Sequence, residues 1–150
     1  VVDVQADTVF AVTPLTELAT QLAEIAGDLN AALSTFNASV GINFAVAGDI
    51  TEVAPTDLAT TASGNDDAGR YATALALISQ LDANDAGATA GQIIAALSAD
   101  IADGTFAQPT LDAFAQAAVD ITMSPVAGNL DNDALMTVEG AINNPSQFVD

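Results

Sequence analysis

The chain has 150 residues and a formal net charge of −19, because 20 Asp and Glu residues stand against a single Arg, with no Lys, His or Cys. This inventory lacks a histidine base, a thiol nucleophile, a Schiff-base amine and the usual ligands of zinc, so it predicts a non-enzymatic protein. One Arg cannot neutralise a row of phosphates, which excludes nucleic acid as a partner. The same acidity, with no apolar run of spanning length, excludes membrane insertion.

The chain is nevertheless rich in apolar side chains. They make up 51% of the sequence, and the mean hydropathy is +0.40. Disordered acidic chains are much poorer in such residues, so this chain is expected to fold. Its length suits one compact domain, and the helical period dominates most of it.

The first two expected elements are a strand segment and a helix. Residues 1–12 alternate and are rich in β-branched side chains, which predicts a short β segment. Because an isolated strand is unstable, we expect it to form a junction with a neighbouring domain. A helix follows, with Thr13 as its cap, Pro14 in its first turn and Gly27 at its end. Its expected buried residues are Leu15, Leu18, Leu22 and Ile25.

A second helix and a long loop come next. Asp28 is expected to cap the helix and Gly41 to end it. The apolar residues of this helix are Leu29, Leu33, Phe36 and Val40. Residues 42–63 contain Gly, Pro and Thr without a sustained period, so they predict a long ordered loop with a short turn of helix near 55–59.

The third and fourth helices have clear start signals. Residues 65–67 (Asn-Asp-Asp) open the third helix, and Thr89 with Gln92 has the spacing of a capping box for the fourth, which Gly104 closes. The expected buried residues are Tyr71, Leu75, Ile78 and Leu81 in the third helix and Ile93, Ile94, Leu97 and Ile101 in the fourth.

Two more helices complete the predicted fold. The fifth is expected from about Thr110 to Pro125, and the sixth over about 131–142. The inward residues of the fifth are Leu111, Phe114, Ala118 and Val119. The predicted fold class is therefore mainly α, a bundle of five to six helices with a short N-terminal β segment. Residues 1–12 are the expected strand junction and 13–150 the helical domain.

Three segments, taken in order, resemble a helical module of large secreted or surface-attached bacterial proteins. They are VTPLTELA (12–19), GDITEVAPTD (48–57) and the pair YATALALISQL (71–81) with IIAALSADIADG (93–104). The proteins with such modules include calcium-dependent adhesins of the repeats-in-toxin type, where the module commonly follows an immunoglobulin-like β-domain. The resemblance, which covers roughly 12–104, implies a structural or adhesive role outside the cell, with adjoining domains of the same polypeptide as partners. It implies no catalytic residue.

Calcium is the candidate cofactor, because it prefers hard oxygen ligands and this chain offers little else. Four Asp residues at expected helix starts are explained by capping and by the helix dipole: Asp28, Asp66, Asp67 and Asp131. Four others lie at expected C-terminal helix ends, where the dipole is unfavourable to a carboxylate: Asp82, Asp85, Asp100 and Asp103. These four are the candidate metal ligands. The alternative is that they are solvated turn side chains, with Asp85 capping the next helix.

The only cation and the only tyrosine are neighbours in the third helix. Arg70 is expected to pair with Asp66, four residues earlier, or to bind loop carbonyls. Tyr71 is expected to place its ring in the core and its hydroxyl at the edge.

Three functional hypotheses remain open. The first is a non-enzymatic structural or spacer module of a bacterial extracellular adhesin or surface protein, with an acidity suited to salt or calcium. The second is an adhesin module that binds an extracellular ligand through the 42–63 loop, which predicts a pocket or an exposed apolar patch near that loop. The third is a cytoplasmic domain of a halophile, whose stability depends on molar salt without a calcium preference.

Overall fold

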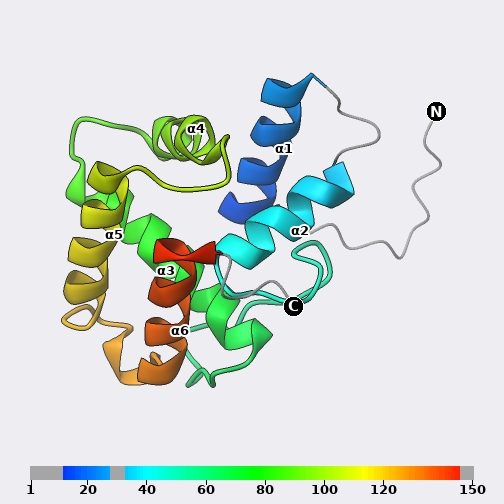
Figure 1. The fold of residues 1–150 in the computed structure, drawn as a ribbon. Coiled ribbons are helices and arrows are strands. Elements are labelled where there is room, and N and C mark those ends of the chain that lie inside the picture. The colour runs from blue at the N-terminus through cyan, green and yellow to red at the C-terminus, as the bar shows by residue number, and fades with distance from the viewer. Residues whose placement is uncertain (1–11, 28–32, 146–150) are drawn as a thin grey trace.

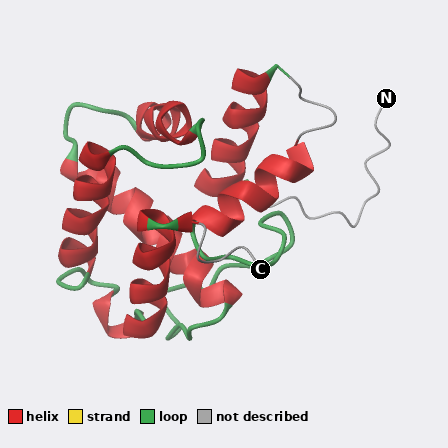
Figure 2. Ribbon diagram, viewed as in Figure 1, coloured by secondary structure: helices red, strands yellow, loops and turns green. Residues whose placement is uncertain are grey.

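The computed structural model describes residues 12–27 and 33–145, which consist of helices joined by turns and loops (Figures 1 and 2). The elements are α1 (Pro14–Ala26), α2 (Leu33–Asn43), α3 (Asp67–Asn84), α4 (Ala90–Ile101), α5 (Gln108–Ile121), the 3₁₀-helix η1 (Ala127–Asn129) and α6 (Asn132–Asn143). The mainly α-helical class is confirmed. The predicted β segment lies, except for Val12, outside the described residues, as does the predicted cap Asp28.

The first helix begins and ends where local chemistry predicts. The Thr13 hydroxyl accepts the Thr16 N–H at 3.3 Å, the Thr13 N–H donates to the Thr16 hydroxyl at 2.8 Å, and Gly27 ends the helix with a φ of 74°. Leu15, Leu18 and Leu22 are buried as expected. Ile25 is 57% exposed, so its predicted burial is wrong, because α1 is exposed over its last three residues, 24–26.

The second helix continues past its predicted end. Gly41 lies inside α2, which ends two residues later at Asn43. A Cβ on Gly41 would stand 2.7 Å from the Val46 carbonyl oxygen, so the glycine permits a close approach of the returning chain. The positive φ that a terminating glycine would have supplied falls instead on Ala45, at 61°. The predicted stop at Gly41 was therefore wrong, because the glycine serves packing.

The third helix is the centre of the molecule. It packs against α5, α6, α4 and α1, and Figure 1 shows it crossing the middle of the fold. Tyr71, Ile78 and Leu81 are buried as predicted, and Leu75 is partly buried. Thr73, Ala74 and Leu77 are fully buried as well, because a central helix is covered on more than one face.

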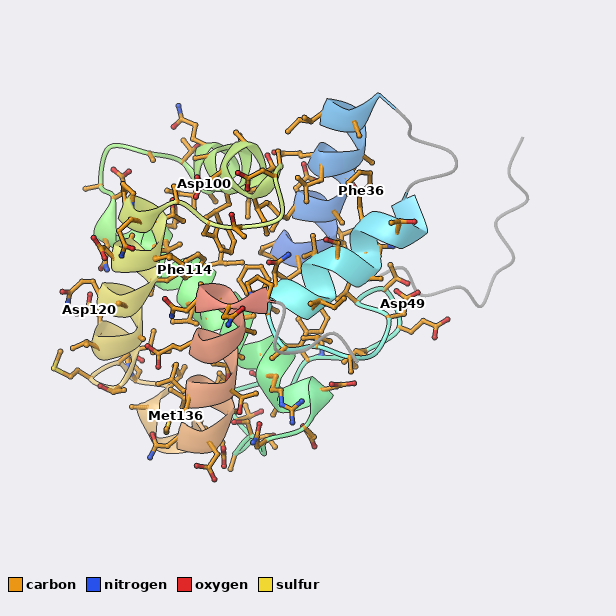
Figure 3. The ribbon with its side chains drawn as sticks, viewed as in Figure 1. Phe36, Asp49, Asp100, Phe114, Asp120 and Met136 are labelled. Carbon is orange, nitrogen blue, oxygen red and sulfur yellow. The ribbon has the colours of Figure 1, made fainter. Side chains whose placement is uncertain are left out.

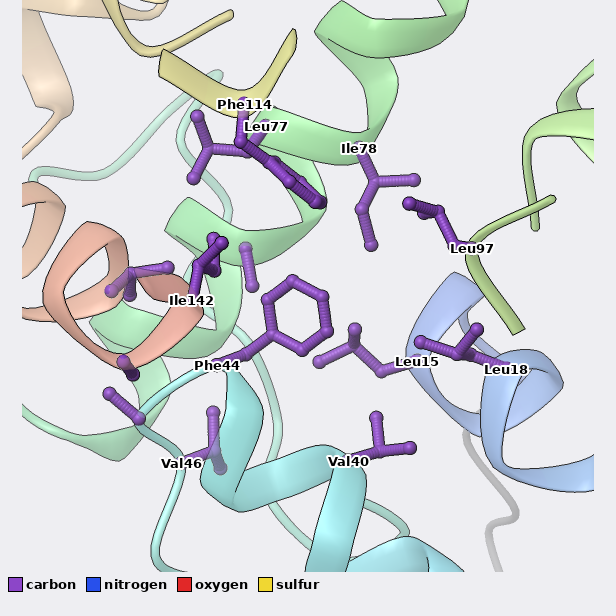
Figure 4. Packing of buried hydrophobic residues seen from close by; sticks show 14 of the residues in the cluster. Leu15, Leu18, Val40, Phe44, Val46, Leu77, Ile78, Leu97, Phe114 and Ile142 are labelled. Carbon is purple, nitrogen blue, oxygen red and sulfur yellow. The ribbon is translucent and has the colours of Figure 1, made fainter. Parts of the chain in front are cut away.

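An aromatic cluster joins segments that are distant in sequence. Phe44 follows α2, Phe106 precedes α5 and Phe114 lies on α5. Their ring centroids are 5.3 to 6.0 Å apart in tilted and edge-to-face arrangements. In Figure 4 the ring of Phe44 lies between the side chains of Leu15 and Ile142. The core is thus one continuous cluster, to which all six helices and the long loop contribute side chains.

The last three helices match the predicted starts more closely than the predicted ends. Thr89 and Gln92 form the expected capping box of α4, and Asp131 caps α6 through the Ala134 N–H at 2.8 Å. Helix α5 begins two residues before Thr110 and ends at Ile121, before the predicted limit at Pro125. Val119, which was expected to be buried, is 54% exposed because it lies on the outer face of α5.

Residues 44–66 form the long loop, which was predicted over 42–63, and they carry part of the core. Phe44, Val46, Ile50 and Leu58 are buried. The short turn of helix expected near 55–59 lies slightly later, as a single turn in which the Asp57 carbonyl accepts the N–H groups of residues 60 and 61.

Candidate functional site

A groove opens between the C-terminal part of α3 and the facing sides of α4 and α5. Its volume is about 480 Å³, within the range of cavities that bind ligands. Helix α4 packs mainly on α1 and α5 mainly on α3, while α4 and α5 make few direct contacts with each other. The groove lies where these two helices, which both contact α3, leave a space between them. Its lining residues are Leu81, Asn84, Asp85, Ile93, Ala96, Leu97, Pro109, Thr110, Ala113 and Gln116.

The floor of the groove is apolar, and small side chains line it on both α4 and α5. Leu81 and Leu97 are buried core residues, and Ile93 packs partly against the same core. Ala96 on α4 and Ala113 on α5 are exposed lining residues with the smallest apolar side chain. The base of the groove is therefore apolar and belongs to the core of the fold.

One side of the groove is polar and fixed by hydrogen bonds. The Asn84 amide donates to Asp120 Oδ2 at 2.8 Å, and the Gln116 amide donates to Asp120 Oδ1 at 2.9 Å. Gln80 in turn donates to Asn84 Oδ1 at 2.8 Å. Asp120, which Figure 3 shows on α5, thus links α5 to α3 through the neutral amide donors Gln116 and Asn84.

The four predicted metal ligands divide into two pairs. Asp82 and Asp85 lie before the start of α4 and Asp100 and Asp103 at its end, so about 16 Å of helix separates the pairs. Among the described residues, no group of three or more His, Cys, Asp or Glu side chains lies close enough to hold a metal ion. The structure therefore does not bring the four carboxylates together, and calcium binding stays a prediction.

Three of the four carboxylates accept local hydrogen bonds. Asp100 accepts the Ala107 N–H at 3.0 Å, which holds the linker to α5, and Asp103 accepts the N–H and the hydroxyl of Thr105, each at 3.1 Å. Asp85 accepts the Gly87 N–H at 3.2 Å. These are the contacts of turn aspartates. The idea that Asp85 caps the next helix is wrong, because Thr89 is the cap of α4.

Asp82 has a different environment. It is partly buried and lines a small pocket of about 170 Å³ where the start of α1 meets α3 and α4. The other lining residues are Pro14, Leu75, Ile78, Ser79, Ala90, Ile93 and Ile94, so the pocket is mostly apolar. It offers a cation one carboxylate and one hydroxyl, which is fewer oxygen ligands than calcium prefers.

The start of α3 holds the long loop in place. Asp66 is the helix cap and accepts the Gly69 N–H at 2.8 Å. Asp67, expected to act at the helix start as well, instead accepts the N–H groups of Ala47 at 3.1 Å and Gly48 at 2.9 Å. The Asp67 carboxylate thereby fastens the loop to the central helix.

Arg70 completes this attachment. Its Nη1 lies 4.0 Å from Asp67 Oδ1, and the guanidinium donates to the Asn65 side chain at 2.8 Å, the Asn65 carbonyl at 3.0 Å and the Ala45 carbonyl at 3.4 Å. The expected bond to loop carbonyls is confirmed. The predicted ion pair with Asp66 is wrong, because that carboxylate caps α3.

The loop also borders a pocket of its own. Its volume is about 230 Å³, and it is lined by Ala38, Ile42, Val46, Ala47, Gly48 and Asp49. Hydrogen bonds from the hydroxyl and the N–H of Thr51, at 2.7 and 2.9 Å, lower the pKa of the Asp49 carboxyl. A pocket therefore exists beside the predicted recognition loop, but it has about half the volume of the groove between α4 and α5.

The fold and these sites define a mainly α-helical protein with an acidic surface. No family model, curated protein or solved structure matches the chain. In the described part of the chain, every helix is too short or too polar to cross a bilayer. Function must therefore be inferred from the residues and their geometry.

Proposed function

We propose that this chain is a non-enzymatic structural module of a bacterial extracellular adhesin or surface protein. It acts as a spacer between adjoining domains of the same polypeptide, with residues 1–12 as the junction, and its acidity suits a salty or calcium-containing exterior. The observation that carries the proposal is the placement of the acidic side chains. None of the Asp and Glu side chains in the described ranges is buried, and most of those with hydrogen bonds accept them from nearby turns and helix starts.

This distribution favours a structural role over a catalytic one. A catalytic carboxylate pair needs two groups that converge and whose environments separate their pKa values. Here the carboxylates serve as caps and turn acceptors, for example Asp131 in α6 and Asp57 in the long loop, which accepts the Ala59 N–H at 3.0 Å. Their shared effect is mutual repulsion across a small surface, which dissolved or bound cations reduce.

Thermal melts in EDTA, NaCl and CaCl2 at matched ionic strength test the proposal. We expect NaCl to raise the melting temperature by screening, and calcium to raise it further by binding carboxylates. D100N and D103N should remove the calcium-specific part of the rise, as should D82N and D85N if the other pair contributes. An Asn side chain still accepts the local hydrogen bonds, so these variants should fold. D112N, on the exposed face of α5, is the matched control.

The outcomes separate the hypotheses. Equal shifts of the melting temperature in NaCl and CaCl2 at matched ionic strength would refute the predicted calcium site. A fold that needs molar NaCl and shows no preference for calcium would favour the halophile domain over the extracellular module. Surface labelling of intact cells that produce the protein tests the location directly, and an exclusively intracellular signal would overturn the proposal.

A further inference from the structure

The lining of the groove between α4 and α5 is suited to contact with a further helix. Packed helices lie about 8–10 Å apart, axis to axis, and small side chains at the contact permit the shorter of these distances. Ala96 and Ala113 supply them on the two walls, and Leu81, Ile93 and Leu97 supply an apolar floor. Because these floor residues are held by the central core, the surface is formed before any partner arrives.

The charge around the groove identifies the kind of partner. Asp85 lines the groove, and Asp120 holds the two lining amides Asn84 and Gln116. The only cation of the chain, Arg70, lies eleven residues before Leu81 on α3, or about 16 Å along the helix, and is held by Asn65 and the loop. The field at the groove is therefore negative without local compensation.

A second copy of the chain is a poor occupant for the same reason. It would bring another net charge of −19 to the interface, and like charges oppose such an association. A segment rich in Lys and Arg, by contrast, is attracted by the same negative charge that repels a second copy.

We propose that this groove is a docking site for a cationic amphipathic helix of a partner polypeptide. The apolar residues of that helix, spaced i, i+3 or i+4, and i+7, lie on Leu81, Ile93 and Leu97, and its Lys or Arg side chains reach Asp85 and Asp120. This goes beyond the spacer role, because it gives the module a partner outside its own polypeptide.

A synthetic peptide serves as the probe. It has about 16 residues, which make a helix of about 24 Å, with Leu at the apolar spacing, Lys and Ala elsewhere, blocked termini and a fluorescent label. Binding to the full chain is measured by fluorescence anisotropy at about 0.15 M and about 0.5 M NaCl. Two comparison peptides carry Ser in place of two central Leu residues, or Glu in place of every Lys.

Paired variants assign binding to the groove. A96Q combined with A113Q fills the groove without changing the charge, and both positions are exposed on their helices, so the fold should survive. A99Q combined with A115Q makes the same change at exposed positions of α4 and α5 that do not line the groove. We expect the groove pair to weaken peptide binding at least about tenfold and the control pair to change it less than about twofold.

Four results would overturn the proposal. Equal effects of the two pairs would place the peptide elsewhere. Equal binding of the Leu and Ser peptides, with loss of both in high salt, would indicate attraction to the acidic surface alone. Binding of the Glu peptide as tight as that of the Lys peptide would refute the charge argument. Self-association of the chain that is abolished by A96Q with A113Q, seen by analytical ultracentrifugation, would make a second copy the occupant.

Discussion

Replacing Tyr71 by Phe removes the hydroxyl that joins three parts of the fold while keeping the ring. Tyr71 is fully buried, and its hydroxyl donates to the Ile50 carbonyl at 3.0 Å and shares a hydrogen bond with the Thr13 hydroxyl. The residue was expected to hold its hydroxyl at the edge of the core, whereas the structure buries it. The Phe variant leaves the Ile50 carbonyl, which belongs to a fully buried residue, without this donor.

The size of the effect follows from these two hydrogen bonds. Loss of two such bonds, with buried partners left behind, should lower the free energy of unfolding by about 2 kcal/mol. For a chain of this length the melting temperature should fall by about 4–8 °C. T73V is the control, since the buried Thr73 hydroxyl donates only to Gly69 within its own helix, at 2.8 Å. We expect T73V to have a smaller effect.

The pH dependence isolates the same hydroxyl. Burial raises the pKa of Tyr71, with the nearby Asp49 charge acting in the same direction and the Thr13 hydrogen bond opposing it. A raised pKa in the folded state contributes stability that is present below the unfolded value of about 10 and is lost as the pH rises through the folded value. The chain has no other Tyr and no Lys or Cys, so other side chains contribute little to this alkaline range.

The assay is urea unfolding followed by circular dichroism between about pH 7 and pH 11, where the phenol ionises. We expect the stability of the wild type to fall above pH 10 and that of Y71F to stay nearly level, so that the gap between them closes. Two results would refute this reasoning: a Y71F stability within about 0.5 kcal/mol of the wild type at pH 7, or the same alkaline fall in both proteins.

Two further pairs of substitutions test packing and charge burial. G41A should destabilise the protein, because the new Cβ would stand 2.7 Å from the Val46 carbonyl oxygen, whereas G140A, with nothing within 4 Å, should stabilise α6 by about 0.5–1 kcal/mol. Urea midpoints measure both, and a G41A midpoint at or above the wild type would contradict the close approach. Burial raises the pKa of Glu139. The stability that this raised pKa contributes is present below the pKa of Glu in the unfolded chain, and it is lost as the pH rises through the pKa in the folded protein. E139Q should therefore raise the melting temperature at pH 7 more than the exposed control E52Q does. The difference between the two variants should disappear at about pH 3, below the ordinary Glu pKa. Equal shifts of the melting temperature at pH 7 would show that only the net charge of the protein matters.

The candidate site could be predicted only in part. The residues of the loop attachment were visible in the sequence, and the bond of Arg70 to loop carbonyls was expected. Asp67 was placed at the helix start and the ion pair of Arg70 was assigned to Asp66, because Asp66 and Asp67 are equally plausible caps when only spacing is known. The groove was not predicted at all. Its only signal was a row of small and polar residues on one side of α5, including Thr110, Ala113 and Gln116, which is also typical of a solvated face.

The sequence by itself determined the helical class and most helix starts, because capping is local chemistry. Thr13, Thr89 and Asp131 each lie within three residues of the N–H that they accept, so no distant contact is needed to place them. Tertiary structure decided which apolar residues stay exposed, such as Ile25 and Val119, and why Gly41 is a glycine. It also decided that α4 packs mainly on α1 and α5 mainly on α3, which leaves a groove between α4 and α5. The space between two helices depends on the neighbours against which each one packs.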